Sequence, residues 1–252
     1  MGVDGFMRKV KVQNVDFGKG MPKIAIPLTG ERLPALYEEL EYVRALPADL
    51  LEWRADYYLG NLLEVPSLLR ENVGEKPLLC TVRTRKEGGQ AALTPEEYEA
   101  AVTALIGTGK FDLVDLELSC GQERLLRLLR LAHEGEMAVV ISKHDFEKTP
   151  PEHEIFCTLL EMERLGAELP KYAVMPQNVR DVLALLSATE RASREFGPVV
   201  TMSMGALGKI SRASGAYFGS CITFAAGKNA SAPGQISAED LKAVLQDLDP
   251  AR

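Results

Sequence analysis

The 252-residue sequence has few of the features that mark metal-binding or disulfide-rich proteins. Its four cysteines lie far apart and form no C-x-x-C pair, which disfavours a zinc site and a dense disulfide framework. Its three histidines have no second ligand at helical spacing, so we expect no metal site.

Other absences concern charge and long apolar runs. The formal net charge is −7, whereas proteins that bind nucleic acid need clustered basic residues. No apolar run approaches the length of a membrane-spanning helix, and the N-terminus lacks the apolar segment of a secretory signal. We therefore expect a cytoplasmic protein that binds a small molecule, and neither nucleic acid nor a membrane.

Eight short apolar runs recur along the chain. Each is apolar nearly throughout, as is typical of parallel strands that are covered on both faces. The runs are Lys23 to Leu28, Leu50 to Asp56, Pro77 to Arg83, Leu113 to Leu118, Ala138 to His144, Tyr172 to Met175, Val199 to Met204 and Cys221 to Ala226.

Amphipathic stretches of helical length separate these runs, among them 33–46, 95–106 and 123–133. Eight strand–helix alternations over this length predict one domain, a (β/α)₈ TIM barrel, over residues 1–252. Residues 1–22 read as an extension that carries a short β-hairpin. A doubly wound open sheet is the alternative, but no G-x-G-x-x-G motif follows the first strand.

Polar residues at the carboxyl ends of barrel strands are the candidate site residues. Glu52 and Arg54 are two positions apart and point to the same side, which fits either a ligand site or a structural ion pair. Arg83 ends the third strand, and a loop with Glu87 and two glycines follows it. These loop charges fit either a site or an ordinary solvated surface.

Four further signals have a structural and a functional interpretation. His144 fits a packed histidine or a proton-transfer group, and Lys171 fits a solvated side chain or a nucleophilic amine. Met202 and Met204, two positions apart, fit core packing or the wall of a pocket. The segment from Ser231 to Gln235 is rich in small residues and fits a mobile lid.

The order of these segments is more informative than any one of them. They resemble the type I 3-dehydroquinate dehydratase family from about Pro22 to the C-terminus. The matching motifs are E-W-R-A-D at 52–56, T-V-R-T-R-K-E-G-G at 81–89, H-D-F at 144–146, P-K-Y-A-V-M-P-Q at 170–177, T-M-S-M-G at 201–205, I-S-R at 210–212, F-G-S at 218–220 and S-A-P-G-Q-I at 231–236.

The resemblance implies a (β/α)₈ barrel and a hydro-lyase of the shikimate pathway, which leads to chorismate and the aromatic amino acids. Such an enzyme converts 3-dehydroquinate to 3-dehydroshikimate through an imine (Schiff base). Lys171 matches the imine-forming lysine, His144 the general acid and base, and Glu87 the carboxylate that orients the histidine. The resemblance implies no metal and no cofactor, because the lysine is the electrophilic catalyst, and it suggests a homodimer.

The resemblance also implies a substrate-binding set. Arg212 matches the carboxylate-binding residue, for which bidentate geometry favours arginine over lysine. Trp53 belongs to the matching motif, although strand alternation turns it toward the helices. The expected set is Glu52, Trp53, Arg54, Arg83, Met202, Met204, Arg212, Phe224, Ser231 and Gln235.

Two positions depart from the family pattern. Pro27 stands where several bacterial relatives carry a small hydroxyl residue. Lys143 replaces the asparagine that commonly precedes the histidine, and we expect its charge to lower the pKa of His144.

Two other functions remain open at this point. A class I aldolase or transaldolase also forms an imine on a barrel lysine, although no obvious phosphate-binding glycine-rich turn follows the seventh strand. A catalytically silent barrel that only binds or regulates is the second alternative. The presence of Lys171, His144, Glu87 and Arg212 together disfavours it.

Overall fold

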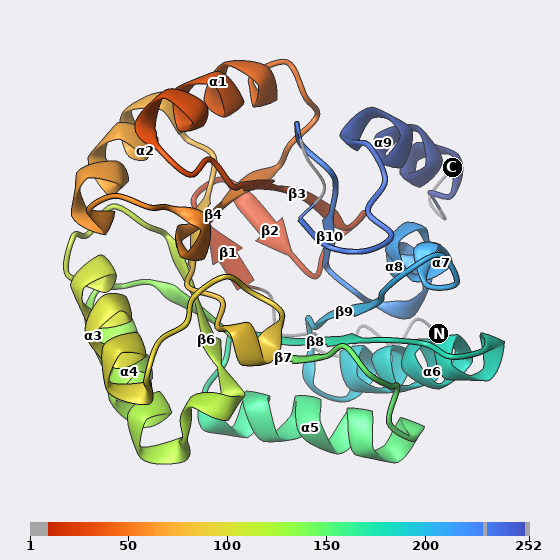
Figure 1. Cartoon of the computed structure of the whole chain (residues 1–252). Helices are drawn as coiled ribbons and strands as arrows, with labels where there is room; N and C mark the ends of the chain where they lie inside the picture. Colours follow the sequence, from red (N-terminus) through yellow and green to blue (C-terminus); the bar gives the residue numbers. More distant parts are fainter. Residues whose placement is uncertain (1–9, 229–230, 250–252) are drawn as a thin grey trace.

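The computed structural model describes residues 10–228 and 231–249 and shows eight parallel strands in a barrel, with helices around it (Figure 1). The barrel strands are β3 (Lys23–Leu28), β4 (Leu50–Arg54), β5 (Leu78–Thr81), β6 (Leu113–Glu117), β7 (Ala138–Asp145), β8 (Leu169–Val174), β9 (Val200–Ser203) and β10 (Ile222–Phe224). Neighbours pair in chain order, and β10 pairs with β3. The ring closes beside β9, where the Cys221 amide donates to the Val199 carbonyl at 2.8 Å.

Helices connect successive strands and form the outer layer (Figure 1). They are α1 (Leu33–Val43), α2 (Val65–Val73), α3 (Pro95–Ile106), α4 (Gln122–Glu134), α5 (Glu152–Leu165), α6 (Val179–Phe196), α7 (Lys209–Ala213), α8 (Gly215–Phe218) and α9 (Ala238–Asp247), with short 3₁₀ helices η1 (Ala55–Tyr57), η2 (Leu62–Glu64), η3 (Arg85–Glu87) and η4 (Leu118–Cys120). Thr94 and Glu97 start α3 with a reciprocal capping box.

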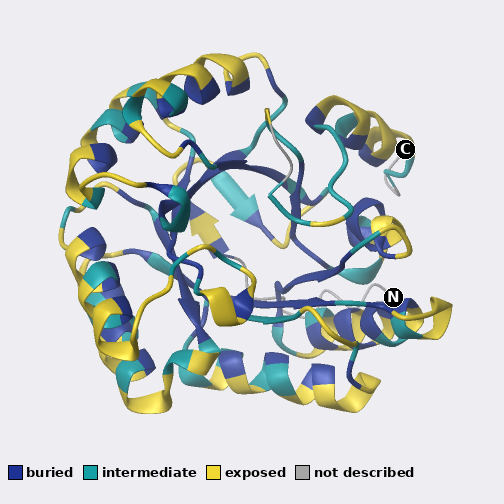
Figure 2. Cartoon of the chain, in the orientation of Figure 1, coloured by how far each residue is buried: buried dark blue, intermediate teal, exposed yellow. Residues whose placement is uncertain are grey.

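Strand alternation divides the apolar residues into two cores. Residues such as Ile26, Trp53 and Tyr172 face the helices and form the larger core. The alternate positions face the barrel axis, where an apolar floor contains Leu50, Leu79, Leu113, Val140 and Leu169. Figure 2 shows the ring of strands buried and the outward helix faces exposed.

A hairpin of β1 (Val10–Val12) and β2 (Val15–Phe17) closes the amino-terminal end of the barrel. Its Phe17 is fully buried and belongs to the inner core. The Gln13 amide donates to Asp112 at 2.6 Å, just before β6. The hairpin therefore plugs one end, and the carboxyl ends of the strands form the other; residues 1–9 of the expected extension lie outside the described residues.

The predicted TIM barrel and hairpin are confirmed, with one notable boundary error. The sixth predicted strand was expected to run from Tyr172 to Met175, with Lys171 at its opening edge, but β8 begins at Leu169. Lys171 therefore lies in the middle of a buried strand. All four cysteines are free, and no helix within the described ranges is long and apolar enough to cross a membrane.

Candidate active site

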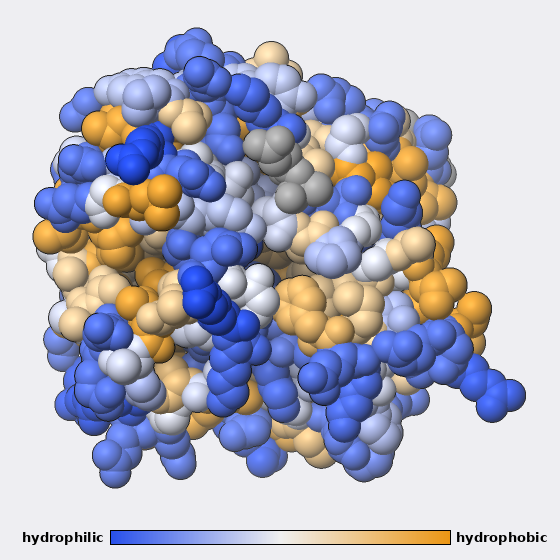
Figure 3. Space-filling view, viewed as in Figure 1, coloured by the Kyte–Doolittle hydropathy of each residue, from blue (hydrophilic) through white to orange (hydrophobic). Residues whose placement is uncertain are grey.

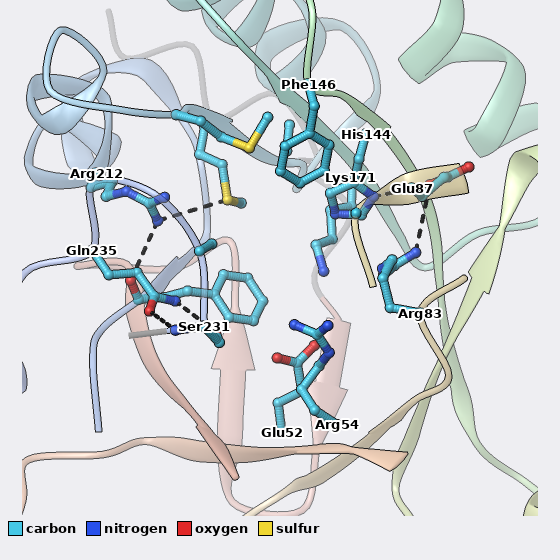
Figure 4. A pocket seen from close by; sticks show the side chains of 16 residues that line it. Glu52, Arg54, Arg83, Glu87, His144, Phe146, Lys171, Arg212, Ser231 and Gln235 are labelled. Carbon is cyan, nitrogen blue, oxygen red and sulfur yellow. Dashed lines mark hydrogen bonds and ion pairs between the residues drawn. The ribbon is translucent and has the colours of Figure 1, made fainter. Parts of the chain in front are cut away.

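A pocket with about 520 Å³ of unfilled space opens at the carboxyl ends of the strands. Side chains from β4, β7, β8, β9 and β10 meet there with the segment after β5, η3, α7 and the loop after β10 (Figure 4). The pocket brings together all the predicted site residues except Trp53: Glu52, Arg54, Arg83, Glu87, His144, Lys171, Met202, Met204, Arg212, Phe224, Ser231 and Gln235. Gly88, Phe146, Ala173 and Ala232 complete its lining.

His144 and Glu87 form a hydrogen-bonded pair at the wall of the pocket. His144 Nδ1 lies 3.0 Å from Glu87 Oε2, and both side chains are largely buried. The Ser119 hydroxyl donates to the other oxygen of Glu87. An ionised Glu87 therefore accepts the Nδ1 proton and leaves Nε2 of the neutral ring as an unprotonated base.

Burial and nearby charges set the protonation states of this pair. Burial lowers the pKa of His144 well below its ordinary value, and the Arg83 and Lys171 cations lower it further. Burial raises the pKa of Glu87 to about 7, although Arg83 opposes that change. His144 is therefore neutral at pH 7, while Glu87 titrates near that pH.

The glycines of the loop after β5 allow the backbone to approach other groups closely. Gly88 has φ +79°, and a Cβ there would lie 2.2 Å from the Phe146 ring. A Cβ on Gly89 would lie 2.0 Å from the Arg83 carbonyl oxygen. The close approach of Gly88 to Phe146 brings η3, and with it Glu87, against the end of β7.

Lys171 projects its amine into the pocket (Figure 4). The amine lies beside the buried carboxylate of Asp115, a residue that was not predicted from the sequence. Its Nζ lies 3.0 Å from Asp115 Oδ2 and 4.6 Å from the centre of the Phe224 ring. Arg83 Nη2 lies 2.7 Å from the same Asp115 oxygen. Burial alone would raise the pKa of Asp115, but Arg83 and Lys171 lower it, so the carboxylate is ionised.

Two further polar residues below the pocket were also missed. Glu117 lies 3.1 Å from Arg83 Nη1, and the Ser142 hydroxyl donates to Asp115 Oδ1 at 2.5 Å. A signal was present, because Asp115 and Glu117 share the inward side of β6 with Leu113. Two charges on one side of an otherwise apolar strand indicate a paired internal site.

Glu52 and Arg54 both line the pocket, which fits the ligand-site alternative, and their hydrogen bonds go to other residues. Arg54 makes a bidentate ion pair with Asp56, with both N–O distances 2.8 Å. Glu52 instead accepts a hydrogen bond from the Thr81 hydroxyl at 2.8 Å. Asp56 lies in η1, two residues after the end of β4, and there it reaches the guanidinium.

Arg212 is a buried cation with no acidic partner among the described residues. Its Nη2 donates to the Pro233 carbonyl at 3.1 Å and its Nη1 to the Phe224 carbonyl at 3.4 Å, while Nε is buried without a hydrogen bond in the described part of the chain. Burial lowers its pKa to about 10, so it remains protonated at pH 7. The arrangement suits a carboxylate that enters from the pocket.

The loop after β10 folds over the pocket beside Arg212. The Ser231 amide donates to Gln235 Oε1 at 2.7 Å, and Gln235 Nε2 donates to the Ser231 hydroxyl at 3.1 Å. The Gly205 amide, after β9, donates to the Pro233 carbonyl at 3.3 Å. Polar side chains dominate this face of the molecule, and apolar ones gather at both of its side margins, near α6 and α7 and near α1 to α3 (Figure 3).

Two expectations about individual side chains are wrong. Trp53 does not line the pocket: it is fully buried in the outer core, stacked on Phe111 at 5.9 Å between ring centres. Lys143 does not face His144, because alternation turns it outward, and its Nζ lies 5.3 Å from the centre of the Tyr172 ring. Besides burial, the cations that lower the pKa of His144 include Arg83, Lys171 and Arg54.

Comparisons with known proteins agree with this geometry. A family model described as type I 3-dehydroquinase matches residues 24–250. The 3-dehydroquinate dehydratase of Listeria innocua is 47% identical over 248 residues, which cover 96% of this chain and 98% of the relative. The similarity therefore includes every residue that lines the pocket.

Solved structures of 3-dehydroquinate dehydratases are also similar to this chain over nearly its full length. A type I 3-dehydroquinate dehydratase from Clostridium difficile, crystallised with covalently modified comenic acid, superposes with a TM-score of 0.92 at 41% identity, covering 96% of this chain and 98% of that one. The 3-dehydroquinate dehydratase of Geobacillus kaustophilus gives a TM-score of 0.91 at 41% identity, with 96% of each chain covered.

Proposed function

This chain belongs to the type I 3-dehydroquinase family, and from that premise we propose that it dehydrates 3-dehydroquinate to 3-dehydroshikimate through an imine on Lys171. One observation carries the mechanism: the Lys171 amine and the His144 ring open into the same pocket. Glu87 holds the far nitrogen of that ring, 3.0 Å away. A nucleophile and a base on one cavity are what an imine-based elimination requires.

The first stage forms the covalent intermediate. The lone pair of neutral Lys171 attacks the C3 carbonyl carbon, and the carbonyl oxygen, after protonation, leaves as water. The product is a protonated imine, whose C=N⁺ group withdraws electrons from C2 and acidifies its proton. Ion pairs around Asp115 hold Lys171 in place for this attack.

The second stage is the elimination. His144 Nε2 takes the C2 proton, the C–H electron pair becomes the C2=C3 bond, and the C=N pair moves onto nitrogen. The C1–O bond then breaks, and the hydroxyl takes the proton from His144 and leaves as water. As the hydroxyl leaves, the C2=C3 pair becomes the C1=C2 double bond and nitrogen returns its pair to form C=N⁺ again. Hydrolysis by water then releases 3-dehydroshikimate and restores the amine. Ionised Glu87 keeps Nε2 available for the first transfer.

The remaining pocket residues bind and enclose the substrate. Arg212, whose Nε lacks a hydrogen bond within the described residues, takes the substrate carboxylate. Glu52, Arg54 and Arg83 supply polar groups for the ring hydroxyls, and the loop carrying Ser231 and Gln235 excludes water. Phe224, Met202 and Met204 form the apolar wall.

Three broader assignments belong to the proposal. We place the reaction in the shikimate pathway, which leads to chorismate and the aromatic amino acids, and in the cytoplasm. We propose a homodimer, which light scattering on the purified protein tests directly. A molar mass close to the 27.6 kDa of one chain would contradict the dimer.

Turnover tests the proposed activity. The product is a conjugated enone, so its formation from 3-dehydroquinate is followed by ultraviolet absorbance. We expect turnover by the wild type, none above background by Lys171→Met, and a rate lower by ~10²–10⁴-fold for His144→Ala. A folded wild-type protein that forms no enone contradicts the proposal.

A further inference from the structure

Asp115 is the one acidic side chain among the described residues that forms an ion pair with the lysine amine. Its Oδ2 lies 3.0 Å from Lys171 Nζ, and the two side chains are 1% and 5% exposed. It reaches the amine from β6, two strands away from β8. The reaction as proposed above assigns no chemical step to this carboxylate.

The surroundings of Asp115 keep it ionised and fixed. Oδ2 also lies 2.7 Å from Arg83 Nη2, and Oδ1 accepts a hydrogen bond from Ser142 at 2.5 Å. These contacts come from the segment just after β5 and from β7, the strands on either side of β6. Both oxygens thus have partners besides Lys171, so the carboxylate does not depend on the ammonium for its position.

We propose that Asp115 is the counter-ion of the iminium: it stabilises the positive charge on nitrogen whenever Lys171 carries the substrate as a protonated imine. This inference rests on the proposed imine mechanism and adds a catalytic residue to it. Asp115 contacts the reacting nitrogen and therefore acts on the charge that makes the imine an electron sink.

The negative charge of Asp115 stabilises the iminium, which favours loss of the C2 proton and the final departure of the C1 hydroxyl as water. A neutral residue at this position therefore leaves more of the imine unprotonated and unreactive.

Other charged groups face the same nitrogen and stay in place during the test. They come from β4, the segment just after β5, η3, β7 and α7, whereas β10 contributes the Phe224 ring. The charged or titratable members are Glu52, Arg54, Arg83, Glu87, His144 and Arg212. Because the cations among them disfavour an iminium, the charge of Asp115 is needed close to the nitrogen.

The test compares Asp115→Asn with a matched control, Glu117→Gln. Glu117 lies on the same strand, is 2% exposed, and also contacts Arg83, at 3.1 Å, but no ion pair joins it to Lys171. Each protein is mixed with excess 3-dehydroquinate over a pH series and pulsed with cyanoborohydride, which reduces protonated imines. Intact mass and peptide mapping then give the labelled fraction at Lys171 and the pH at which labelling falls by half.

We expect this midpoint to fall by roughly 1–3 pH units in Asp115→Asn, the size of shift that an adjacent opposite charge causes. We expect Glu117→Gln to keep the wild-type midpoint. Asp115→Glu retains the charge, so its midpoint should lie close to that of the wild type. If Asp115→Asn does not fold, Asp115→Ser replaces it in the same comparison.

The possible failures are distinguishable. A wild-type protein that is not labelled on Lys171 overturns the imine mechanism and this inference together. Labelled wild type with the same midpoint in the neutral Asp115 variants overturns only the counter-ion role. An equal shift in Glu117→Gln also overturns it, because the effect would then come from Arg83.

Discussion

At the scale of single residues, the chemistry of the pocket depends on which neighbour each charged group meets. Arg83 contacts Asp115 at 2.7 Å and Glu117 at 3.1 Å, and it lies 3.6 Å from Glu87. One guanidinium therefore connects the carboxylate beside the lysine with the carboxylate beside the histidine. Changes to either pair are expected to alter the charge balance of the other.

The pKa of Glu87, raised to about 7 by burial, predicts a pH dependence for catalysis. Above that pH the ionised carboxylate accepts the Nδ1 proton, and Nε2 of His144 is free to act as a base. Below it Glu87 is protonated and donates to Nδ1, so the ring proton sits on Nε2. We expect kcat/KM to fall about tenfold per pH unit below pH 7.

Glu87→Gln is the control for this assignment. This variant has no titrating group at position 87, so the decline of kcat/KM below pH 7 should disappear. Its kcat/KM at pH 8 should be lower than that of the wild type. A wild-type profile that is flat from pH 6 to 8 would exclude Glu87 as the controlling group.

Arg212→Lys tests the anion site. A lysine keeps the positive charge but cannot donate two parallel hydrogen bonds to a carboxylate. We expect KM for 3-dehydroquinate to rise about tenfold or more, with kcat changed less, since charged hydrogen bonds contribute about 1.5–3 kcal/mol. An unchanged KM would show that the substrate carboxylate binds elsewhere in the pocket.

At the scale of elements, the loop after β10 docks against the loop after β9 through glycines. Gly234 has φ +78°, and a Cβ there would lie 2.3 Å from the Gly205 carbonyl oxygen. The backbone of these loops must move apart to accept any side chain at Gly234. The docked position of Ser231 and Gln235 over the pocket depends on this close approach.

We therefore predict that Gly234→Ala raises KM at least severalfold and lowers kcat, because the loop no longer closes over the substrate. Gly74→Ala is the matched control: Gly74 also has positive φ, at +63°, but a Cβ there meets no atom within 4 Å. It should lose stability by about 1 kcal/mol and keep its kinetics. Equal KM and kcat values in the two variants would show that the loop after β10 does not act as a lid.

Much of the architecture was predictable at this scale because alternation and capping are local. The start of β8 was not, because Pro170 and Lys171 resemble the polar edge of a strand. Lys171 lies in the strand interior, where its amine meets Asp115, 56 residues earlier in the chain. The contact between Asp115 and Lys171 depends on a distance across strands, which one sequence does not contain. The Arg54–Asp56 pair is local, but it depends on how the chain turns into η1 after β4.

At the scale of the whole molecule, stability and chemistry are located at opposite ends of the barrel. The hairpin and the apolar floor, with Phe17, Leu50 and Leu113, fill the amino-terminal end. The charged residues occupy the layers above, toward the carboxyl ends. This separation predicts that damage to the floor changes stability without changing substrate binding.

Phe17→Ala tests that separation. Removal of this fully buried ring should lower the free energy of unfolding by about 3–5 kcal/mol, measured by denaturant titration. The KM of the folded fraction should stay at the wild-type value. A large change in KM would show that the plug also shapes the pocket.

The most direct test of the central claim, that Lys171 forms an imine with 3-dehydroquinate, is reductive trapping at a single pH. The protein is mixed with 3-dehydroquinate and borohydride, and its intact mass and peptide map are measured. We predict one substrate-sized adduct on the peptide that contains Lys171, and no such adduct in Lys171→Met. A folded, active wild type with no adduct, or with the adduct on another lysine, would contradict it.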